Sequence, residues 1–190
     1  MTKLGIIIAS TRPGRIGLPI SQWMAEEARS HGGFDEVELI DLAEINLPFF
    51  DEPHHPRLRT YIHDHTVKWS ELVDGVDAFI MVTPEYNYGI SAVLKNAIDY
   101  LNAEWAYKAV GFVSYGGVSA GTRAVQMTKQ VVSTLRMMPV LDAVSLPFAM
   151  NNVDEDGYHP NEIATGAAKA MLDELVKVDE QLRGLRNSAS

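Results

Sequence analysis

The stretch from Leu4 to Gly17 carries the residue types that hold an anion. A β-branched run from Ile6 to Ile8 precedes a short polar stretch, and an amphipathic segment begins near Leu18, so a strand, a tight loop and a helix start are expected. The loop combines hydroxyls, glycines that admit a close backbone approach, and guanidinium groups, at Ser10, Thr11, Gly14, Gly17, Arg12 and Arg15. Because the first N–H groups of a helix favour negative charge, phosphate is the expected ligand.

Most strand-to-helix turns bind nothing, since any such turn needs a glycine and a cap, so a purely structural turn stays open at this point. The sequence contains no G-x-x-x-x-G-K-[ST], which argues against a nucleoside triphosphatase. It also contains no G-x-G-x-x-G after a strand, which argues against a dinucleotide site of Rossmann type. A phosphate in this loop would be held in another way.

Strand-like apolar runs alternate with helical patterns five times along the chain. The strands are expected around Ile6 to Ile8, at Val37 to Leu42, Ala78 to Thr83 and Ala109 to Tyr115, and within Val140 to Leu146. This alternation predicts an α/β fold: a doubly wound five-stranded parallel sheet with helices on both faces. In the strand order 2-1-3-4-5, right-handed crossovers bring three loops together at the carboxyl edge, at Ser10 to Gly17, Pro84 to Gly89 and Tyr115 to Gly117.

The helices are expected to bury one face each. The first ends at the Gly32–Gly33 pair, another runs from Tyr61 to Val73, and the last runs from about Asn161 to Leu185. Ile62 in the Tyr61 to Val73 segment and Met127 in the helix after the third loop are among the positions expected to be buried.

The composition of the chain limits the classes of function that are open to it. A chain of 190 residues with 46% hydrophobic and 22% charged residues predicts one domain over residues 1–190 with a substantial core. The net charge of −9 disfavours a nucleic-acid partner. There is no cysteine, so thiolate chemistry and disulfides are excluded. The absence of a signal peptide or a membrane-spanning run predicts a cytoplasmic protein without a membrane partner.

The second and third loops suit a flat polar ring. The second is rich in aromatic and amide groups, and the third has two glycines after Tyr115. Backbone groups there can approach a ring edge, and Tyr86 or Tyr88 can cover a ring face. A phosphate at one end and a planar ring at the other outline a mononucleotide. Alternatively, one of these tyrosines packs against the following helix or against a partner subunit.

At these residues the sequence resembles the NADPH-dependent FMN reductases of flavodoxin-like fold, which include quinone, azo-dye and chromate reductases. The resemblance covers most of the chain. Its motifs are Ala-Ser-Thr-Arg-Pro-Gly-Arg at 9–15, Thr-Pro-Glu-Tyr-Asn at 83–87 with Leu-Lys-Asn-Ala-Ile-Asp at 94–99, and Tyr-Gly-Gly at 115–117 ahead of Gly121 and Arg123. The middle block is the most specific.

The resemblance implies an FMN site. It assigns the phosphate to Ser10, Arg12 and the backbone near Ile16 and Gly17, the isoalloxazine to Pro84, Glu85, Tyr86 and Asn87, and the pyrimidine side of the ring to Tyr115, Gly116 and Gly117. Many relatives have serine where this chain has Arg15, so the hydroxyl that would meet the FMN phosphate is replaced either by a second guanidinium or by nothing. Arg15 could instead meet the 2′-phosphate of NADPH, and its role is left open.

The resemblance also implies a ping-pong oxidoreductase. NADPH or NADH delivers hydride to flavin N5 and leaves, and a small acceptor such as a quinone, a flavin, an azo compound or a metal oxyanion then takes two electrons. No side chain is assigned as a catalytic acid or base, although a backbone N–H near Asn87 would face N5. Relatives are usually dimers, so a homodimer or a tetramer is expected. The residues that give it weak support, as interface residues or else as ordinary packing residues, are Phe49, Phe50, Trp105 and Tyr107.

Two other functions are open. Gly117-Val-Ser119-Ala-Gly121 matches G-x-S-x-G, and Asp142 or Asp154 followed by His159 would complete a serine hydrolase. However, Gly116 and Gly117 follow the strand end at Tyr115 before Ser119 is reached, and no His-Gly-Gly segment is present. A flavodoxin-type electron carrier would also suit the acidic charge.

No metal site is expected. The pairs His54-His55 and His63-x-His65 do not match metal-binding spacings.

Overall fold

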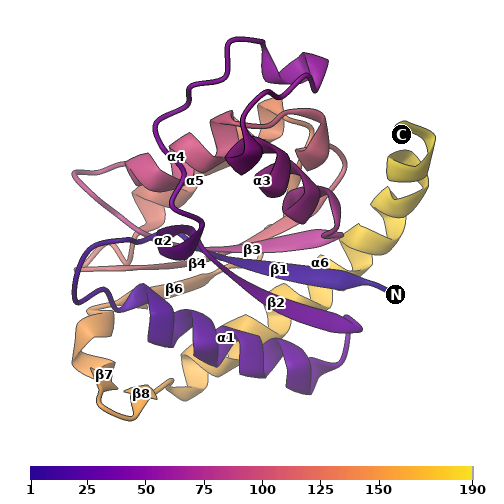
Figure 1. Cartoon of the computed structure of the whole chain (residues 1–190). Helices are drawn as coiled ribbons and strands as arrows, with labels where there is room; N and C mark the ends of the chain where they lie inside the picture. Colours follow the sequence, from indigo (N-terminus) through magenta and orange to yellow (C-terminus); the bar gives the residue numbers. More distant parts are fainter. Residues whose placement is uncertain (190) are drawn as a thin grey trace.

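Strand β1 (Lys3–Ile8) lies inside a parallel sheet in the computed structural model, which describes residues 1–189. The order β2-β1-β3-β4-β5 confirms the expected topology, and Figure 1 shows the sheet between helices. The other strands are β2 (Glu36–Asp41), β3 (Ala78–Pro84), β4 (Ala109–Gly116), β5 (Met138–Pro139) and β6 (Val144–Pro147).

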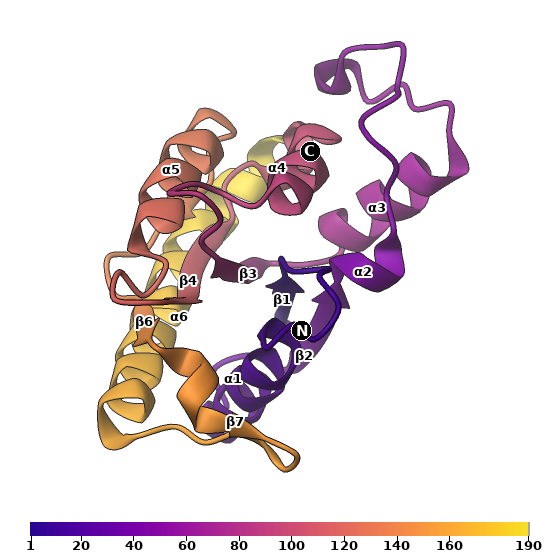
Figure 2. The same ribbon diagram turned by 90° about the vertical axis from the view of Figure 1, so that its left-hand side faces the viewer.

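Two helical layers cover the sheet. Helices α1 (Gly17–His31) and α6 (Glu162–Ala189) cover one face, and α3 (Asp64–Asp74), α4 (Ala92–Asp99) and α5 (Thr122–Thr134) cover the other (Figure 2). Each layer encloses its own apolar cluster. Successive residues of β1 alternate between the two, with Ile6 on the α1 and α6 side and Ile7 on the other, because side chains of a strand point to opposite faces.

β3 is buried along its whole length, which is why its sequence is almost continuously apolar. Beneath α3 and α4 the rings of Trp69 and Phe79 both pack edge-on against Trp105, at centroid distances of 6.0 and 5.2 Å. Trp105 is fully buried. Of the two alternatives for Trp105, an interface residue or a packing residue, the structure therefore supports the second, because its side chain belongs to the core of this chain.

The parallel register aligns the strand ends. Ile8 pairs with Val82 and Pro84 pairs with Tyr115, so β1, β3 and β4 all end at one edge of the sheet. The three predicted loops leave from that edge, as the strand order requires.

The remaining elements are short and are not strands of the main sheet. They are α2 (Leu42–Ile45), the 3₁₀ turns η1 (Pro56–Leu58), η2 (Ala103–Trp105) and η3 (Ala149–Asn152), and the hairpin of β7 (Val153–Asp154) and β8 (Gly157–Tyr158). The segment 46–63 carries η1 away from the sheet (Figure 1).

Several expected elements need correction. The fifth strand is in two pieces, because β5 pairs with Val110 and β6 pairs with β4 only from Val113 onward, with the chain leaving the sheet between them. Met127 and Ile62 are 45% and 59% exposed, so both are wrong as core positions. The helix expected from Tyr61 begins only at Asp64, and α6 continues beyond Leu185.

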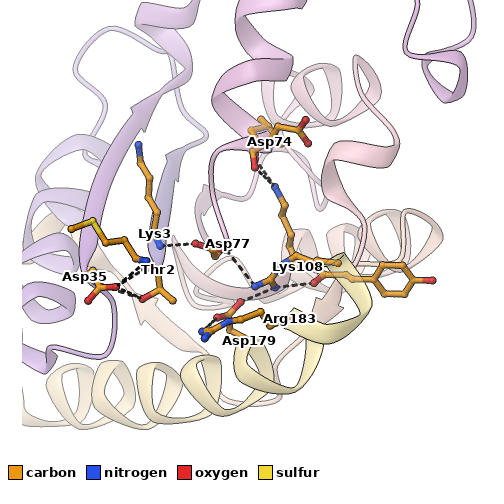
Figure 3. A network of polar contacts seen from close by, with 12 residues as sticks. Thr2, Lys3, Asp35, Asp74, Asp77, Lys108, Asp179 and Arg183 are labelled. Atoms are coloured by element: carbon orange, nitrogen blue, oxygen red, sulfur yellow. Dashed lines mark hydrogen bonds and ion pairs between the residues drawn. The ribbon is translucent and has the colours of Figure 1, made fainter. Parts of the chain in front are cut away.

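A polar network closes the amino edge of the sheet (Figure 3). Lys108 donates to the carbonyls of Val73 and Asp74 at 2.6 and 3.2 Å, which satisfies the last carbonyls of α3. Burial lowers the pKa of Lys108 to about 8. Asp77 accepts from the Lys3 N–H at 2.8 Å.

Among residues 1–189, no helix combines the length and apolarity that crossing a bilayer requires.

Candidate functional site

A cavity of about 300 Å³ lies at the carboxyl edge of the sheet and is formed by all three predicted loops. Its walls consist of Arg12, Gly14, Arg15, Ile16, Pro84, Glu85, Tyr86, Tyr115, Gly116, Gly117 and Met150. Of the residues that the resemblance assigns to FMN, three do not line it: Ser10, Gly17 and Asn87. Thr11 and Tyr88, which the loop compositions suggested, also lie outside its lining. The three loops are therefore brought together, as the fold predicts.

The first loop ends in a helix start without a side-chain cap. Ile16 occupies the N-cap position of α1 and makes no side-chain hydrogen bond to the helix, and the first turn contains no acidic residue. The N–H groups of this turn are thus available to an anion at the positive end of the helix dipole.

Two hydroxyl groups lie close to Gly17, the first residue of α1. A Cβ at this position would collide with Ser10 Oγ and would lie 2.5 Å from the Tyr115 hydroxyl. Ser10 is 1% exposed and Tyr115 is 6% exposed, and neither hydroxyl makes a hydrogen bond of regular geometry among the described residues. The two hydroxyls are close enough that Ser10 partly offsets the rise that burial causes in the pKa of Tyr115, but no other polar group of the described chain pairs with either of them. Since an unpaired buried hydroxyl costs about 1–3 kcal/mol, a ligand with acceptor oxygens fits this place.

Tyr115, which the resemblance assigns to the pyrimidine side of the ring, lines the cavity, and its hydroxyl faces the start of α1. Burial raises the pKa of Tyr115 to about 12. Its hydroxyl is therefore protonated at neutral pH and able to donate a hydrogen bond to an anion.

The two arginines of the first loop have different surroundings. Arg15 donates from Nη1 to the Ser10 carbonyl and to Asp41 Oδ1, both at 2.6 Å, and its other terminal nitrogen is paired with the second carboxylate oxygen of Asp41. The hydrogen bonds to Asp41 raise the pKa of Arg15. Arg12 is exposed, lines the cavity and has no ion pair among residues 1–189. Asp41 was not among the candidate site residues identified from the sequence. Its position at the end of β2, at the same edge of the sheet as the three loops, could have indicated it.

The second loop is a tight reverse turn. Tyr86 and Gly89 exchange backbone hydrogen bonds of 3.0 and 3.3 Å, and the two residues between them, Asn87 and Tyr88, have φ of 49° and 71°. These are the signs of a type I′ turn. After the turn, Ser91 caps α4 by accepting from Leu94 N at 3.2 Å and donates to the Ala9 carbonyl at 2.9 Å, which ties α4 to the end of β1.

Glu85 joins the second loop to α5. Its carboxylate accepts from Arg123 Nε at 2.6 Å, from the Arg123 backbone N–H at 3.1 Å and from Ser119 Oγ at 3.1 Å. Arg123 also lies over the ring of Tyr88, with its guanidinium carbon 3.5 Å from the ring centroid. Tyr88 thus packs against a helix, which is the structural alternative considered for one of the two tyrosines, whereas Tyr86 lines the cavity.

The third loop closes the cavity from β4. The carbonyl of Gly116 accepts from Phe148 N at 2.8 Å, which holds η3 beside the loop. Met150, on η3, lines the cavity, and no motif in the sequence pointed to it. At Gly121, φ is 79° and a Cβ would lie 2.9 Å from backbone atoms of Tyr115, so the close approach requires glycine.

The hydrolase alternative has a different arrangement. The side-chain partner of Ser119 is the carboxylate of Glu85, whereas His159 pairs with Asp154 at 2.8 Å on the exposed β7–β8 hairpin. The hydrogen bond from His159 is the main cause that lowers the pKa of Asp154.

The paired histidines of the loop lie elsewhere. His63 and His65 stack on one another with centroids 5.1 Å apart and face Asp51. Within residues 1–189, no group of three or more histidine, aspartate or glutamate side chains is arranged to hold a metal ion.

Comparisons with known proteins identify relatives. A family model described as NADPH-dependent FMN reductase matches residues 2–151. An NAD(P)H-dependent FMN reductase of Schizosaccharomyces pombe is 38% identical over 149 residues, which are 76% of this chain and 74% of that protein. Another protein of that description, from a Nectria species, is 32% identical over 154 residues, or 78% of this chain and 77% of that protein.

The fold is shared with solved flavoenzyme structures. FerB, an NAD(P)H:(acceptor) oxidoreductase from Paracoccus denitrificans, superposes with a TM-score of 0.76 and covers 95% of this chain and 98% of its own. The sequence identity is 17%, so this likeness establishes the flavodoxin-like fold alone.

Proposed function

The chain belongs to the NADPH-dependent FMN reductase family, and we propose that the cavity between the loops 10–17, 84–89 and 115–117 is its FMN site. The protein is an FMN-dependent NAD(P)H oxidoreductase. One observation carries the proposed position: two buried hydroxyls without partners face the uncapped start of α1. An anion held at this place would also satisfy the helix N–H groups.

The phosphate end of the ligand is assigned to Ser10, Tyr115, Arg12 and the first N–H groups of α1. The hydroxyls donate hydrogen bonds, and Arg12 supplies a positive charge that no described carboxylate neutralises. Arg15 is paired with Asp41, so we propose that its main role is to hold the shape of the loop rather than to contact the phosphate.

The ring end is assigned to the turn after β3 and to the glycines after β4. Pro84, Glu85 and Tyr86 form one wall, and Gly116 and Gly117 form the other. When bound, FMN supplies the hydride chemistry. The residues of the chain bind the group, orient it and leave one side accessible beside Met150, which is 67% exposed.

The electron acceptor is a small molecule. Quinones, free flavins, azo compounds and metal oxyanions are the classes expected, and the residues beside the ring would select among them. We also propose a homodimer or a tetramer, supported by exposed apolar side chains of the segment 46–63: Phe49 at 86%, Leu58 at 65% and Ile62 at 59% exposure. A cytoplasmic location is proposed from the absence of cysteine.

The test begins with the spectrum of the purified protein. We expect a flavin absorbance that FMN restores after its removal, and rapid bleaching when NADPH or NADH is added without oxygen. A protein that takes up no FMN would refute the site and the activity together. A flavin that stays oxidised until a separate reductase is added would identify an electron carrier.

The position of the site is tested by Ser10→Ala, which removes one of the two unpartnered hydroxyls. We expect roughly tenfold weaker FMN binding, because a hydrogen bond to a charged phosphate is lost. The control is Ser133→Ala on α5, whose hydroxyl bonds its own helix at 2.7 Å. Equal affinity of Ser10→Ala and the wild type would place the phosphate elsewhere.

A further inference from the structure

The turn beside the proposed flavin ring has a strained backbone. Asn87 and Tyr88 both lie in the left-handed region, with φ of 49° and 71°, and a bulky side chain such as that of Tyr88 rarely adopts it. Such a conformation persists only where the surroundings hold it. The residues that hold this turn therefore decide the shape of one wall of the cavity.

A single arginine contacts the residue before the turn and a residue inside it. Arg123 donates to Glu85 before the turn, at 2.6 Å, and stacks at 3.5 Å on the ring of Tyr88 inside it. Its planar guanidinium allows both contacts at once, which an ammonium group does not. Ser119 and the Arg123 backbone N–H give Glu85 two further hydrogen bonds, so the carboxylate stays anchored to α5 when the arginine side chain is changed.

Glu85 brings a negative charge to the cavity. Glu85 is one of the residues that line the cavity, its side chain is 7% exposed, and Arg123 is its only ion-pair partner among the described residues. Two-electron reduction adds negative charge to a flavin, so a carboxylate near the ring opposes reduction unless a cation compensates it.

We propose that Arg123 is a positioning residue of the flavin site, which clamps the turn 86–89 through Tyr88 and neutralises Glu85 beside the ring. This inference rests on the proposed FMN site. The clamp raises FMN affinity because the wall is already in its binding conformation, and the ion pair keeps the reduction potential of the flavin from falling.

The first measurement is the dissociation constant of FMN for the apoprotein. Arg123→Gln is expected to raise it roughly tenfold, since part of the binding energy then orders the turn. The matched control is Arg136→Gln. Arg136 also lies over a tyrosine with positive φ, Tyr107 at 58°, with its guanidinium carbon 5.8 Å from that ring, but neither residue lines the cavity. The control should bind FMN as the wild type does.

The second measurement is the reduction potential of the bound FMN. Arg123→Gln should make it more negative, Glu85→Gln should make it more positive, and the double variant should lie closer to the wild type. Arg123→Lys keeps the charge but loses the planar stack, so it should weaken FMN binding and largely preserve the potential.

Two results would overturn the inference: unchanged FMN affinity in both Arg123 variants, or a change of potential in Arg123→Gln that Glu85→Gln does not reverse. A role confined to folding would lower the melting temperature and leave the potential of the refolded complex alone. If Arg123→Gln does not fold, the FMN affinity of Arg123→Lys alone tests the inference: weaker binding supports it, and unchanged binding overturns it. Failure of the wild-type protein to bind FMN would instead refute the proposed function, and the wild-type arm shows this separately.

Discussion

Arg15 and Asp41 form a two-point ion pair that joins the first loop to the end of the edge strand β2. Arg15 Nη1 lies 2.6 Å from Asp41 Oδ1, and the same carboxylate oxygen accepts from Ala43 N at 2.9 Å as the cap of α2. Asp41 is 8% exposed. The second guanidinium of the loop thus shapes the cavity wall, while the first faces the cavity without a carboxylate partner in residues 1–189.

Asp41→Asn should therefore destabilise the fold. It leaves the part-buried Arg15 charge unpaired, for which we expect a loss of about 2 kcal/mol in the free energy of unfolding. Urea unfolding of the apoprotein measures this. The control is Asp99→Asn, which breaks the exposed pair of Lys95 and Asp99 and should cost less than about 0.5 kcal/mol. Equal effects of the two changes would mean that the Arg15–Asp41 pair stabilises the fold no more than the exposed Lys95–Asp99 pair does.

Arg12→Ala should act on the ligand rather than on the fold. Because Arg12 is exposed and has no ion pair among the described residues, its loss should leave the unfolding free energy within about 0.5 kcal/mol. FMN should bind about ten- to a hundredfold more weakly, as expected for the loss of a charge-assisted hydrogen bond. Calorimetric titration with FMN distinguishes the two effects, and full retention of affinity would remove Arg12 from the site.

Gly17→Ala should block the phosphate end of the cavity. The added methyl would collide with Ser10 Oγ and lie 2.5 Å from the Tyr115 hydroxyl, so it would displace the two hydroxyls that are proposed to donate to the phosphate. We expect at least about tenfold weaker FMN binding, or about 1.4 kcal/mol. Gly166→Ala is the control, because a methyl at Gly166 of α6 meets nothing within 4 Å. FMN binding equal to that of the control would contradict the proposed site.

Lys108 should give the stability of the protein a dependence on alkaline pH. Its pKa is about 8 in the folded protein and 10.5 for a lysine in water, so between these values the unfolded chain binds more protons. The free energy of unfolding should then rise with pH across this window, by at most about 3 kcal/mol, relative to Lys108→Met. Asp74 and Asp77 raise the pKa of Lys108 and Arg186 lowers it, but burial dominates. Urea unfolding of both proteins at pH 7.5, 9 and 10 measures the difference, and parallel curves would contradict it.

Tyr61→Phe tests the anchoring of the segment 46–63. The Tyr61 hydroxyl donates at 2.7 Å to Glu104, whose carboxylate is fully buried and also accepts from Ser70 Oγ at 2.7 Å. Losing one donor to a buried charge should cost about 1.5–3 kcal/mol of stability. FMN affinity should not change, because Tyr61 lies outside the cavity. Weaker FMN binding with unchanged stability would show that this segment contributes to the site.

The contents of the cavity were largely predictable because parallel strands have a direction. Once β1, β3 and β4 are adjacent, the residues after their last paired positions must share an edge, and the turns that began at Ser10, Pro84 and Tyr115 do so. Errors arose where periodicity was the only guide. Met127 fits a helical stripe, but it lies against Gly89 at the surface and remains 45% exposed.

By itself, the sequence determined the alternation of strands and helices, the family and the three loops, because local patterns of apolar, glycine and hydroxyl residues are read along the chain. Only the tertiary structure decided which partners the polar side chains take. Arg15 with Asp41, Glu85 with Arg123 and the Tyr115 hydroxyl at Gly17 are contacts between segments far apart in the chain. Spacing carries no information about such pairs, since they depend on where the packed sheet places each strand end.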